Sequence, residues 1–545
     1  MAKIVTVQQM RAIEKAADAS GLTYAMMMEN AGRGVAQEIL DRWPDLDGKR
    51  VAILVGPGNN GGDGLVVGHY LAEAGGQVGI CLAKPRAEGD ANLARLQGKD
   101  ILIANAADDQ RWRVLRNMIE TADIVIDAVL GTGFRLPLEG DAKKLLKNAG
   151  AALARRERRP YIVAVDCPSG LDCDTGEIAV EALGADLTVT LAAAKPGLIR
   201  FPGAESVGEL VVRDIGIAPD QKQLAGVDLN LANAESVATL LPPRPRNAHK
   251  GTFGRAIVVA GSVTFPGAAS LAAVAAYRAG AGLVTLAGPT PIQGLVAPQL
   301  PEATWLLLPH EMGVIAADGV DILEKELGSC QALLLGPGFG QDMATADFMR
   351  KLLLAEKRTQ RGKIGFVHTE RGKAKGLSGL PPCVIDADGL KLLTKIKNWA
   401  ANLPPETILT PHPGEMEVLT GEKKKAIQAD RVGAAKRWAS EWGHVVVLKG
   451  AFTVVAGSDG RATVLPFATA ALARAGTGDV LAGAIVGLRA QGLGAYEAAV
   501  LGSYLHGRAG ELAAEELGCE MSVLAGDVAN ALPAAVAELQ LGKRE

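Results

Sequence analysis

The stretch "AILVGPGNNGGDGLVVGHYL", residues 52–71, decides the fold of the first half of the chain. A short apolar run enters a glycine-rich turn, and the turn opens into a helical pattern. Gly56, Gly58 and Gly61 fit G-x-G-x-x-G, a pattern in which backbone amides at a helix N-terminus bind phosphate. Two asparagines and an aspartate stand among these glycines, which is unusual beside a pyrophosphate. The stretch predicts a strand, a tight turn and a helix, and it leaves the ligand of the turn open.

Short β-branched runs alternate with longer Ala- and Leu-rich helical patterns from about residue 49 to 215. This alternation is typical of βαβ units around a mostly parallel sheet. Two helices are predicted before the first run, within residues 6–40. The runs that predict strands are "RVAILVG" (50–56), "QVGICLA" (77–83), "ADIVIDAVLG" (122–131), "YIVAVD" (161–166) and "DLTVTLA" (186–192).

A second series of strand-like runs begins near residue 254, after the proline-rich segment "LLPPRPRNAHKG" (240–251). A proline cluster cannot continue a helix or a central strand, so it favours a domain boundary nearby. The two halves differ in their motifs, which indicates a fusion of two unlike α/β domains. We predict a Rossmann-like three-layer domain at residues 1–222 and a second α/β domain at residues 223–545. Residues 356–382 are basic and glycine-rich and are expected to form a surface insertion.

The composition excludes several classes of function. The 545 residues carry 57 basic and 60 acidic side chains, a net charge of −3, so no broad basic surface predicts nucleic acid as a partner. The six cysteines contain no C-x-x-C pair, which argues against a disulfide framework and a structural zinc site. The first residues lack the layout of a signal peptide, and no apolar run is long enough to span a bilayer. We expect a cytoplasmic enzyme with no membrane partner.

The second strand argues against NAD as a redox cofactor. In a hydride-transferring Rossmann domain an acid about 20 residues after the glycines usually closes that strand and binds the ribose. Lys84 stands at this place instead. The glycine turn still permits a phosphate-bearing ligand, and a turn that serves packing alone is the alternative.

Polar side chains follow three of the predicted strands. Asn60 follows the first strand, Asp127 ends a second, and Asp166 and Ser169 follow a third. Ligands of open α/β sheets bind outside the carboxyl ends of the strands, so we expect these side chains to converge on one site. Oxygen ligands of this kind suit a hard cation better than zinc, and a free carboxylate can transfer a proton. A helix cap or turn former is the alternative for any single one of them.

Five stretches of the first half resemble, in order, the NAD(P)HX epimerase family. They are "MMMENAG" (26–32), "GPGNNGGDG" (56–64), "DAVLGTGF" (127–134), "AVDCPSGLDCDTG" (164–176) and "AAAKPGL" (192–198). The family interconverts the R and S forms of hydrated NADH or NADPH, so the glycine turn would bind a dinucleotide as substrate. The resemblance implies potassium on Asn60, Asp127 and Ser169, with Asp166 our choice of acid/base group. The implied substrate contacts are Asn59, Asn60, Gly61, Gly62, Asp63, Gly131, Thr132, Gly133, Phe134, Arg135, Leu136, Pro137 and Asp166.

The sharpest motif of the second half is "ARAGTGDVLAGAIVGLRAQG" (473–492). Small residues from Ala475 to Gly478 form a turn before a helix, where backbone amides and the helix dipole favour an anion. Asp479 stands at the helix start and can take a hydroxyl proton while the amides stabilise a phosphoryl group. An aspartate that simply favours the positive end of the helix is the alternative.

Two further elements of the second half fit a nucleotide site. "VVVLKGAFTVVAG" (445–457) predicts a hairpin with Lys449 and Gly450 at its turn, although a lone lysine there is usually only solvated. "TPHPGEMEVLTG" (410–421) places His412 between prolines after a strand, and such a histidine is more often structural than catalytic.

These and other stretches resemble the ADP- or ATP-dependent NAD(P)HX dehydratase family, which has a ribokinase-like fold. They are "GTFGRAIVVAGS", "FPGAASLAAVAAYRAGAGLVT", "LLLGPGFG", "VIDADGL", "TPHPGEMEVLTG", "LKGAFTVVA" and "AGTGDVLAG". The family phosphorylates the C6 hydroxyl of the S epimer and eliminates phosphate to restore NAD(P)H. The resemblance implies magnesium, ADP or ATP as donor with ADP the expected one, and a homo-oligomer.

The resemblance also implies roles for individual residues of the second half. Asp479 would be the base on the C6 hydroxyl. The anion hole would be Ala475, Gly476, Thr477 and Gly478. The adenine nucleotide would contact Lys449, Gly450, Ala451, Phe452, Thr453 and Gly478, and the hydrated nucleotide would contact Ala268, Gly338, His412 and Asp479.

The sequence departs from the dehydratase pattern just before the anion hole. Family members often show Asn-Pro there, whereas this chain has Thr469 and Ala470, followed by Arg474.

Two functions other than nucleotide repair stay open. One is a ribokinase-like small-molecule kinase fused to a nucleotide-binding module without activity, although His412 stands near the asparagine of the usual Asn-x-x-Glu magnesium stretch. The other is a first half that serves only as a binding or scaffold module.

Overall fold

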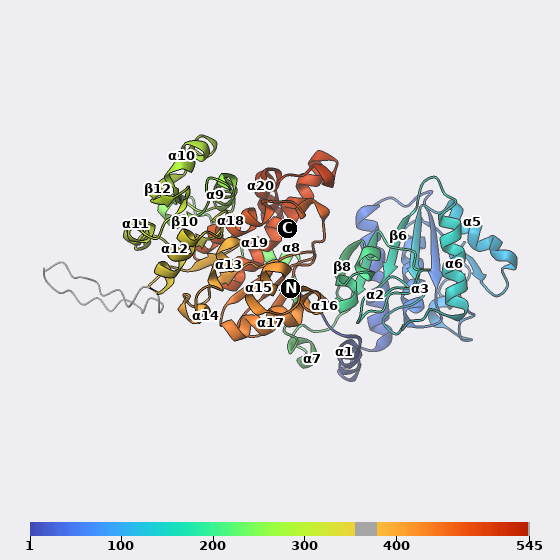
Figure 1. The fold of residues 1–545 in the computed structure, drawn as a ribbon. Helices are drawn as coiled ribbons and strands as arrows, with labels where there is room; N and C mark the ends of the chain where they lie inside the picture. Colours follow the sequence, from blue (N-terminus) through green and yellow to red (C-terminus); the bar gives the residue numbers. More distant parts are fainter. Residues whose placement is uncertain (355–378, 543–545) are drawn as a thin grey trace. The chain divides into compact units, whose positions relative to one another are not determined.

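The computed structural model describes residues 1–354 and 379–542, and most of the predicted insertion at 356–382 lies outside these residues. The described chain forms two compact units. The first runs from Ala2 to Asn230, and the second starts at Leu231 and includes Met1. The first unit is drawn in blue to green and the second in green to red (Figure 1).

The first unit is built on a sheet of seven strands that are all parallel, in the order β4-β3-β2-β5-β6-β7-β8. The chain starts this sheet at β2, proceeds to β3 and β4 on one side, and then returns to β5 on the other. The strand order therefore switches between β2 and β5, where open α/β sheets bind their ligands. The strands are β2 (Arg50–Val55), β3 (Gln77–Leu82), β4 (Leu102–Asn105), β5 (Ile124–Ala128), β6 (Tyr161–Val165), β7 (Leu187–Leu191) and β8 (Glu209–Arg213). Two short strands, β1 (Ala2–Lys3) and β9 (Leu229–Leu231), do not belong to this sheet.

Helices cover both faces of this sheet. Along β2, Ile53 packs on the side of α2 and α3, whereas Leu54 packs on the side of α5 and α6, as expected for a strand buried on both faces. The predicted Rossmann-like α/β layers are confirmed. The helices are α1 (Val7–Ala19), α2 (Tyr24–Arg42), α3 (Asn59–Glu73), α4 (Ala91–Ala94), α5 (Arg113–Thr121), α6 (Gly140–Leu153) and α7 (Lys222–Ala225), with 3₁₀ turns η1 (Gln110–Trp112), η2 (Pro196–Ile199) and η3 (Gly203–Ser206).

The second unit contains a mixed sheet with the order β20-β19-β18-β17-β16-β15-β10-β11-β12. Its strands are parallel from β12 to β18, and the hairpin of β18, β19 and β20 is antiparallel. The bounds are β10 (Arg255–Val259), β11 (Leu283–Pro289), β12 (Thr304–Leu308), β15 (Ala332–Leu335), β16 (Cys383–Ile385), β17 (Ile408–Leu409), β18 (Val445–Leu448), β19 (Val454–Ala456) and β20 (Ala462–Val464), with a separate hairpin β13 (His310–Glu311) and β14 (Val314–Ile315).

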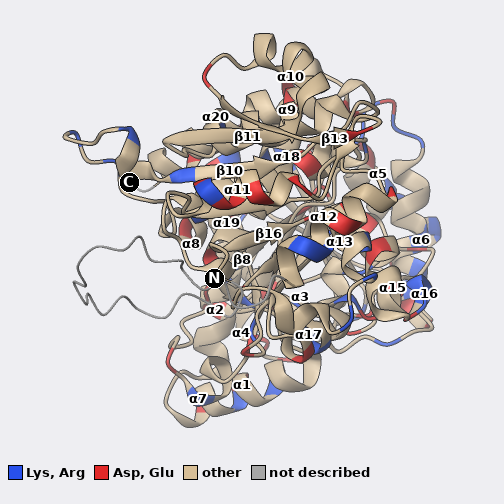
Figure 2. Ribbon diagram, turned by 60° about the vertical axis from the view of Figure 1, so that its left-hand side comes forward, with Lys and Arg blue, Asp and Glu red and all other residues tan. Residues whose placement is uncertain are grey.

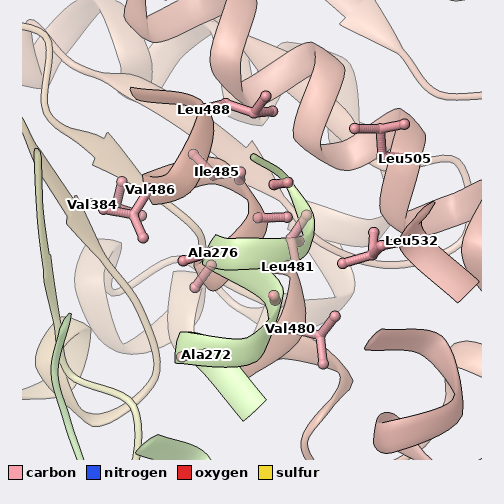
Figure 3. Close-up of a cluster of buried hydrophobic side chains, with 14 of the residues drawn as sticks. Ala272, Ala276, Val384, Val480, Leu481, Ile485, Val486, Leu488, Leu505 and Leu532 are labelled. Carbon is pink, nitrogen blue, oxygen red and sulfur yellow. The ribbon is translucent and has the colours of Figure 1, made fainter. Parts of the chain in front are cut away.

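The core of the second unit is centred on α18, which is buried along most of its length. Glycines of α18 let α9 approach closely: a Cβ on Gly483 would lie 2.1 Å from the carbonyl oxygen of Ala272, and one on Gly487 would lie 2.5 Å from that of Ala276. Figure 3 shows Ala272 and Ala276 of α9 beside the apolar side chains of α18. This packing fixes the helix whose N-terminus carries the predicted anion hole.

The other helices of the second unit surround this core. They are α8 (Ala234–Ala238), α9 (Pro266–Arg278), α10 (Thr290–Val296), α11 (Gly319–Leu327), α12 (Met343–Leu354), α13 (Asp388–Leu393), α14 (Trp399–Asn402), α15 (Pro413–Thr420), α16 (Lys424–Ala429), α17 (Arg431–Trp442), α18 (Thr477–Ala490), α19 (Ala495–Leu517) and α20 (Ala525–Leu541), with 3₁₀ turns η4 (Lys250–Phe253), η5 (Ala297–Gln299), η6 (Ala470–Leu472) and η7 (Glu520–Ser522). Acidic and basic residues are interspersed along the helices (Figure 2). Within the described residues, no helix combines the length and apolar character needed to cross a membrane.

Candidate functional site

The first candidate site lies at the switch between β2 and β5. Asn60, in the first turn of α3, donates from Nδ2 to the carbonyl oxygen of Leu130 at 3.0 Å. Ser169 donates to Asp127 twice, from its hydroxyl at 2.5 Å and from its backbone amide at 2.8 Å. The amide of Leu130 in turn donates to the hydroxyl of Ser169 at 2.8 Å. The structure therefore brings the three predicted potassium ligands together around Leu130.

This cluster is rich in oxygen and is almost closed to water. Asn60 is 8 % exposed, Asp127 1 % and Ser169 0 %. The Oδ1 atom of Asn60 is buried without a hydrogen-bond partner among the described residues. Burial raises the pKa of Asp127, and its hydrogen bonds from Ser169 act in the opposite direction. An orphaned amide oxygen beside a carboxylate and a hydroxyl fits a hard cation such as potassium.

The glycine turn serves close backbone packing as well as ligand access. A Cβ on Gly56 would lie 1.8 Å from the carbonyl oxygen of Val129, and one on Gly61 would lie 2.0 Å from that of Gly56. Gly58 by contrast faces open space. Arg86 braces the turn, because its Nη1 donates to the carbonyl oxygens of Gly56 at 2.9 Å and Gly58 at 3.1 Å. Sequence reasoning did not identify this arginine.

Asp166 directly follows β6 in a left-handed backbone conformation, with φ at 66°. Its Oδ1 accepts from the ammonium of Lys195 at 2.5 Å, from the hydroxyl of Thr190 at 3.2 Å and from the amide of Leu191 at 3.3 Å. Lys195 is 1 % exposed, and it also donates to Thr190 and to the carbonyl oxygen of Leu191. Burial disfavours the ammonium, but the charge of Asp166 outweighs it and the pKa of Lys195 is raised. Lys195 was present in a quoted motif, yet nothing in the sequence marked it as the partner of Asp166.

The predicted substrate loop at 131–137 borders this site. A Cβ on Gly131 would lie 3.1 Å from the Cβ of Asn60, so the loop passes directly over that side chain. Arg135 is half-exposed and donates to Asp174 at 2.8 Å, and Asp174 also accepts from the amide of Val7 at the start of α1. The loop is thus linked to α1 on one side and lies against Asn60 on the other.

The second candidate site lies at the carboxyl ends of β16, β17 and β18. Asp386, Thr410 and Lys449 directly follow these three strands. Oδ1 of Asp386 accepts from the ammonium of Lys449 at 2.5 Å and from the hydroxyl of Thr410 at 2.7 Å. Lys449 also lies 3.5 Å from Oε2 of Glu415. Sequence reasoning singled out Lys449 but missed Asp386 as its partner.

The predicted anion hole faces this ion pair. A Cβ on Gly478 would lie 3.4 Å from the ammonium of Lys449 and 3.7 Å from Oδ2 of Asp386. That Oδ2 atom is buried without a hydrogen-bond partner among the described residues. A cation and an unsatisfied carboxylate oxygen therefore border the amides at the start of α18.

Hydrogen bonds of two side chains fix the conformation of the turn that forms the predicted anion hole. Gly476 has a φ of 89°, which glycine adopts without strain, and α18 begins at the next residue. The hydroxyl of Thr477 donates to the carbonyl oxygens of Leu472 and Arg474, both at 2.9 Å. The buried ring of His506 donates to the carbonyl oxygen of Thr477 at 2.8 Å, and burial lowers the pKa of His506 to about 4.

Asp479 combines its place beside the anion hole with a strongly shifted pKa. Burial, together with the carboxylate of Asp386, raises this pKa to about 7, although Lys449 acts in the opposite direction. A general base works best when its pKa lies near the operating pH. Asp479 can therefore take a proton from a hydroxyl at neutral pH and return it afterwards.

The remaining predicted residues include those expected to contact the hydrated nucleotide. Of these, Ala268 and Gly338 lie against each other, since a Cβ on Gly338 would be 2.8 Å from that of Ala268. His412 caps α15 by accepting from the amides of Gly414 and Glu415, at 3.0 and 3.1 Å. The turn between β18 and β19 contains most of the predicted contacts to the adenine nucleotide, and the hydroxyl of Thr453 donates to the carbonyl oxygen of Gly450 at 2.8 Å.

Two residues that depart from the dehydratase pattern make contacts with the η7 turn. Arg474 donates to the carbonyl oxygen of Met521, and the hydroxyl of Thr469 donates to Glu520 at 2.7 Å.

Known families match both halves of the chain. A family described as NAD(P)H-hydrate dehydratase matches residues 256–534, and one described as YjeF-related protein N-terminus matches residues 24–197. A bifunctional NAD(P)H-hydrate repair enzyme of Moorella thermoacetica is 37 % identical over 549 residues, which cover 98 % of this chain and 97 % of that one. The chain belongs to the family of bifunctional NAD(P)H-hydrate repair enzymes.

Other members of the repair-enzyme family match at similar length. The enzyme of Thermofilum pendens is 33 % identical and covers 95 % of this chain and 93 % of its own. A solved ADP/ATP-dependent NAD(P)H-hydrate dehydratase from Bacillus subtilis, co-crystallised with ATP and Mg²⁺, is 30 % identical with a TM-score of 0.45, and covers 57 % of this chain and 98 % of its own. The family resemblance inferred from the motifs of each half is confirmed.

Proposed function

We propose that the protein repairs hydrated nicotinamide nucleotides in two steps. The first unit interconverts the R and S epimers of NADHX and NADPHX. The second unit phosphorylates the C6 hydroxyl of the S epimer at the expense of ADP and eliminates phosphate to restore NADH or NADPH. The observation that carries the proposal is the pairing, in one chain, of the Asn60–Asp127–Ser169 cluster with an Asp479 whose pKa lies at about 7 beside an anion hole.

In the epimerase unit, Asn60, Asp127 and Ser169 would hold potassium, which would offset the charge of Asp127 and orient oxygen atoms of the substrate. The turn at residues 59–63 and the loop at 131–137 would contact the dinucleotide. Asp166 would transfer a proton, because its Oδ2 atom is not engaged by the three donors that hold Oδ1. The fit of potassium rests on the unpartnered Oδ1 of Asn60.

In the dehydratase unit, Asp479 would take the proton of the C6 hydroxyl while the amides of residues 475–478 stabilise the transferred phosphoryl group. Lys449 adds positive charge at the same point. Within the described residues no group of three His, Cys, Asp or Glu side chains forms a metal cage. This fits a magnesium ion that is held mainly by phosphates of the donor, as magnesium commonly is.

The turn at residues 449–453 would contact the adenine nucleotide, and Ala268, Gly338 and His412 would line the pocket of the hydrated nucleotide. The ammonium of Lys449, the first residue of this turn, pairs with Asp386 and lies beside Gly478 of the anion hole. We also expect a homo-oligomer, which light scattering of the purified protein would test.

The deciding experiment follows the recovery of NADH absorbance from a mixture of both NADHX epimers, with magnesium, potassium and either ADP or ATP. The proposal expects full recovery, with ADP the better donor. An Asp166→Ala variant should recover only the S fraction promptly. Prompt recovery of only the S fraction by the wild-type protein would leave the first unit as a binding module. No recovery with either donor would instead favour a small-molecule kinase.

A further inference from the structure

Epimerisation at C6 requires two proton transfers, and this inference rests on that proposed activity. The hydroxyl-bearing carbon is bonded to the ring nitrogen, so the C–O bond can break when a proton is given to the leaving oxygen. A water molecule must then add to the opposite face and lose a proton. Sites that perform such chemistry need one group to give a proton and another to accept one. The first unit contains two carboxyl groups with opposite surroundings.

Asp166 has the surroundings of the ionised partner. The ammonium of Lys195 contacts its Oδ1 at 2.5 Å, and the hydroxyl of Thr190 and the amide of Leu191 donate to the same atom. Lys195 has no solvent to replace this contact, because it is fully buried and its other contacts are neutral oxygens. Removing the charge of Asp166 would leave that ammonium buried without a counter-ion.

Asp63 has the opposite surroundings. It lies one helical turn after Asn60, on the same side of α3, and it is 7 % exposed. Its carboxyl makes no hydrogen bond or ion pair within residues 1–354 and 379–542. Burial raises the pKa of Asp63 well above its usual value, and the carboxylates of Asp166 and Glu14 add to this effect.

The charged groups around Asp63 come from four different segments of the first unit. Glu14 belongs to α1, Asp166 follows β6, Lys195 precedes η2 and Arg86 follows β3. The two cations lower the pKa of Asp63, but each already has a closer carboxylate: Lys195 pairs with Asp166, and Arg86 pairs with Asp90 at 2.6 Å. A proton on Asp63 is therefore the state that burial and the neighbouring acids favour.

We propose that Asp63 is the general acid of the epimerase site and that Asp166, positioned by Lys195, is the general base. The carboxylic acid of Asp63 protonates the C6 oxygen, the C–O bond breaks, and the lone pair of the ring nitrogen forms a C=N bond as water leaves. A second water attacks C6 from the other face, its electron pair forms the new C–O bond while the electrons of the C=N double bond return to the ring nitrogen, and Asp166 takes its proton. Proton exchange with solvent returns Asp63 to the acid and Asp166 to the carboxylate, and the reverse reaction exchanges their roles.

The test uses the full-length Asp63→Asn variant and the purified R epimer of NADHX. We expect kcat of epimerisation to fall about 100-fold or more while KM changes by less than about threefold. Asp63→Glu should recover part of kcat. Wild-type kcat should decline at alkaline pH as Asp63 loses its proton. In water enriched in ¹⁸O, each inversion by the wild-type protein should place one ¹⁸O at C6.

Two controls accompany this test. Asp109→Asn changes another buried aspartate, which only caps amides of α5, and it should leave epimerisation unchanged. Dehydration of the S epimer by each variant reports that the second unit is folded, and the thermal unfolding of each variant compared with the wild-type protein reports the folding of the first unit. A wild-type protein inactive on the R epimer would instead contradict the proposed function itself.

Three outcomes would overturn the assignment in an active protein. They are an Asp63→Asn variant with normal kcat, one that changes KM alone, and inversion without ¹⁸O uptake. The first two would make Asp63 a binding or structural residue, and the third would exclude cleavage of the C–O bond.

Discussion

Replacing Asp386 by Asn should shift the pH dependence of dehydration. Kcat of the wild-type protein should rise with an inflection near pH 7, because Asp479 must be ionised to act as a base and its pKa is about 7. Asp386 contributes the largest charge effect that raises this pKa, and Lys449 opposes it. An amide at position 386 can still accept from Thr410, but it carries no negative charge. The loss of that charge lowers the pKa of Asp479 directly, and the ammonium of Lys449, which then has lost this counter-ion, lowers it further.

The size of the shift follows from the proximity of these groups. A charge within such a cluster typically moves a pKa by about 1 to 3 units. Taking about one unit, the ionised fraction of Asp479 at pH 6 rises from about a tenth to about a half, so the rate relative to its own plateau rises about fivefold. The plateau itself should fall, because the ammonium of Lys449 loses its fixed position.

The assay measures kcat for the pure S epimer with saturating ADP and magnesium, from pH 5.5 to 8.5, by the return of NADH absorbance. Asp321→Asn is the matched control, since Asp321 is an exposed acid that pairs with Lys351 on the surface. Its inflection should stay at that of the wild-type protein. An inflection in Asp386→Asn that stays within about 0.2 pH units, or moves to higher pH, would refute the coupling of Asp386 to the base.

Three further predictions concern the other parts of the molecule. Asn60→Ala should raise the potassium concentration for half-maximal epimerisation about tenfold or more, measured against a constant ionic strength, and an unchanged value would contradict the cation site. Asp479→Asn should lower kcat of dehydration about 100-fold or more and leave epimerisation intact, measured by chromatography of the two epimers; retained dehydration would exclude Asp479 as the base. Gly483→Ala should destabilise the second unit by about 1 to 3 kcal/mol, because its Cβ would lie 2.1 Å from the carbonyl oxygen of Ala272. In the control Gly294→Ala the Cβ meets open space within α10, so the melting temperature should hold or rise, and equal melting curves for both variants would refute the packing argument.

Local patterns predicted the central strands of the seven-stranded sheet well. The run at 50–56 became β2 at Arg50–Val55, and that at 161–166 became β6 at Tyr161–Val165. These strands are buried on both faces, so their sequences are continuous apolar runs bounded by turn residues. In the seven-stranded sheet, β4 and β8 escaped notice for the opposite reason: they lie at its edges and contain exposed and polar residues.

The partners of the site residues could not be predicted from the sequence. Asp166 and Lys195 are 29 residues apart, and Asp386 and Lys449 are 63 apart. Each pair forms only because parallel strands place their carboxyl ends at one edge of the sheet. The sequence motifs pointed to Asp166 and Lys449. No hydrophobic periodicity or fixed residue spacing connects Asp166 with Lys195, or Lys449 with Asp386. The predicted domain limits and site roles remain predictions that the experiments above address.

The two sites share one physical arrangement despite their different folds. In each, a lysine that is buried or mostly buried contacts an aspartate at 2.5 Å, and a second carboxyl nearby has a raised pKa. The lysine holds its partner in place, and the carboxylate of that partner, together with burial, favours the proton on Asp63 or Asp479. An acid that is fully buried retains its proton and suits protonation of a leaving oxygen. An acid with a pKa of about 7 can be ionised at neutral pH and suits removal of a proton from a hydroxyl. The degree of burial beside the lysine–aspartate pair therefore decides which direction of proton transfer each site favours.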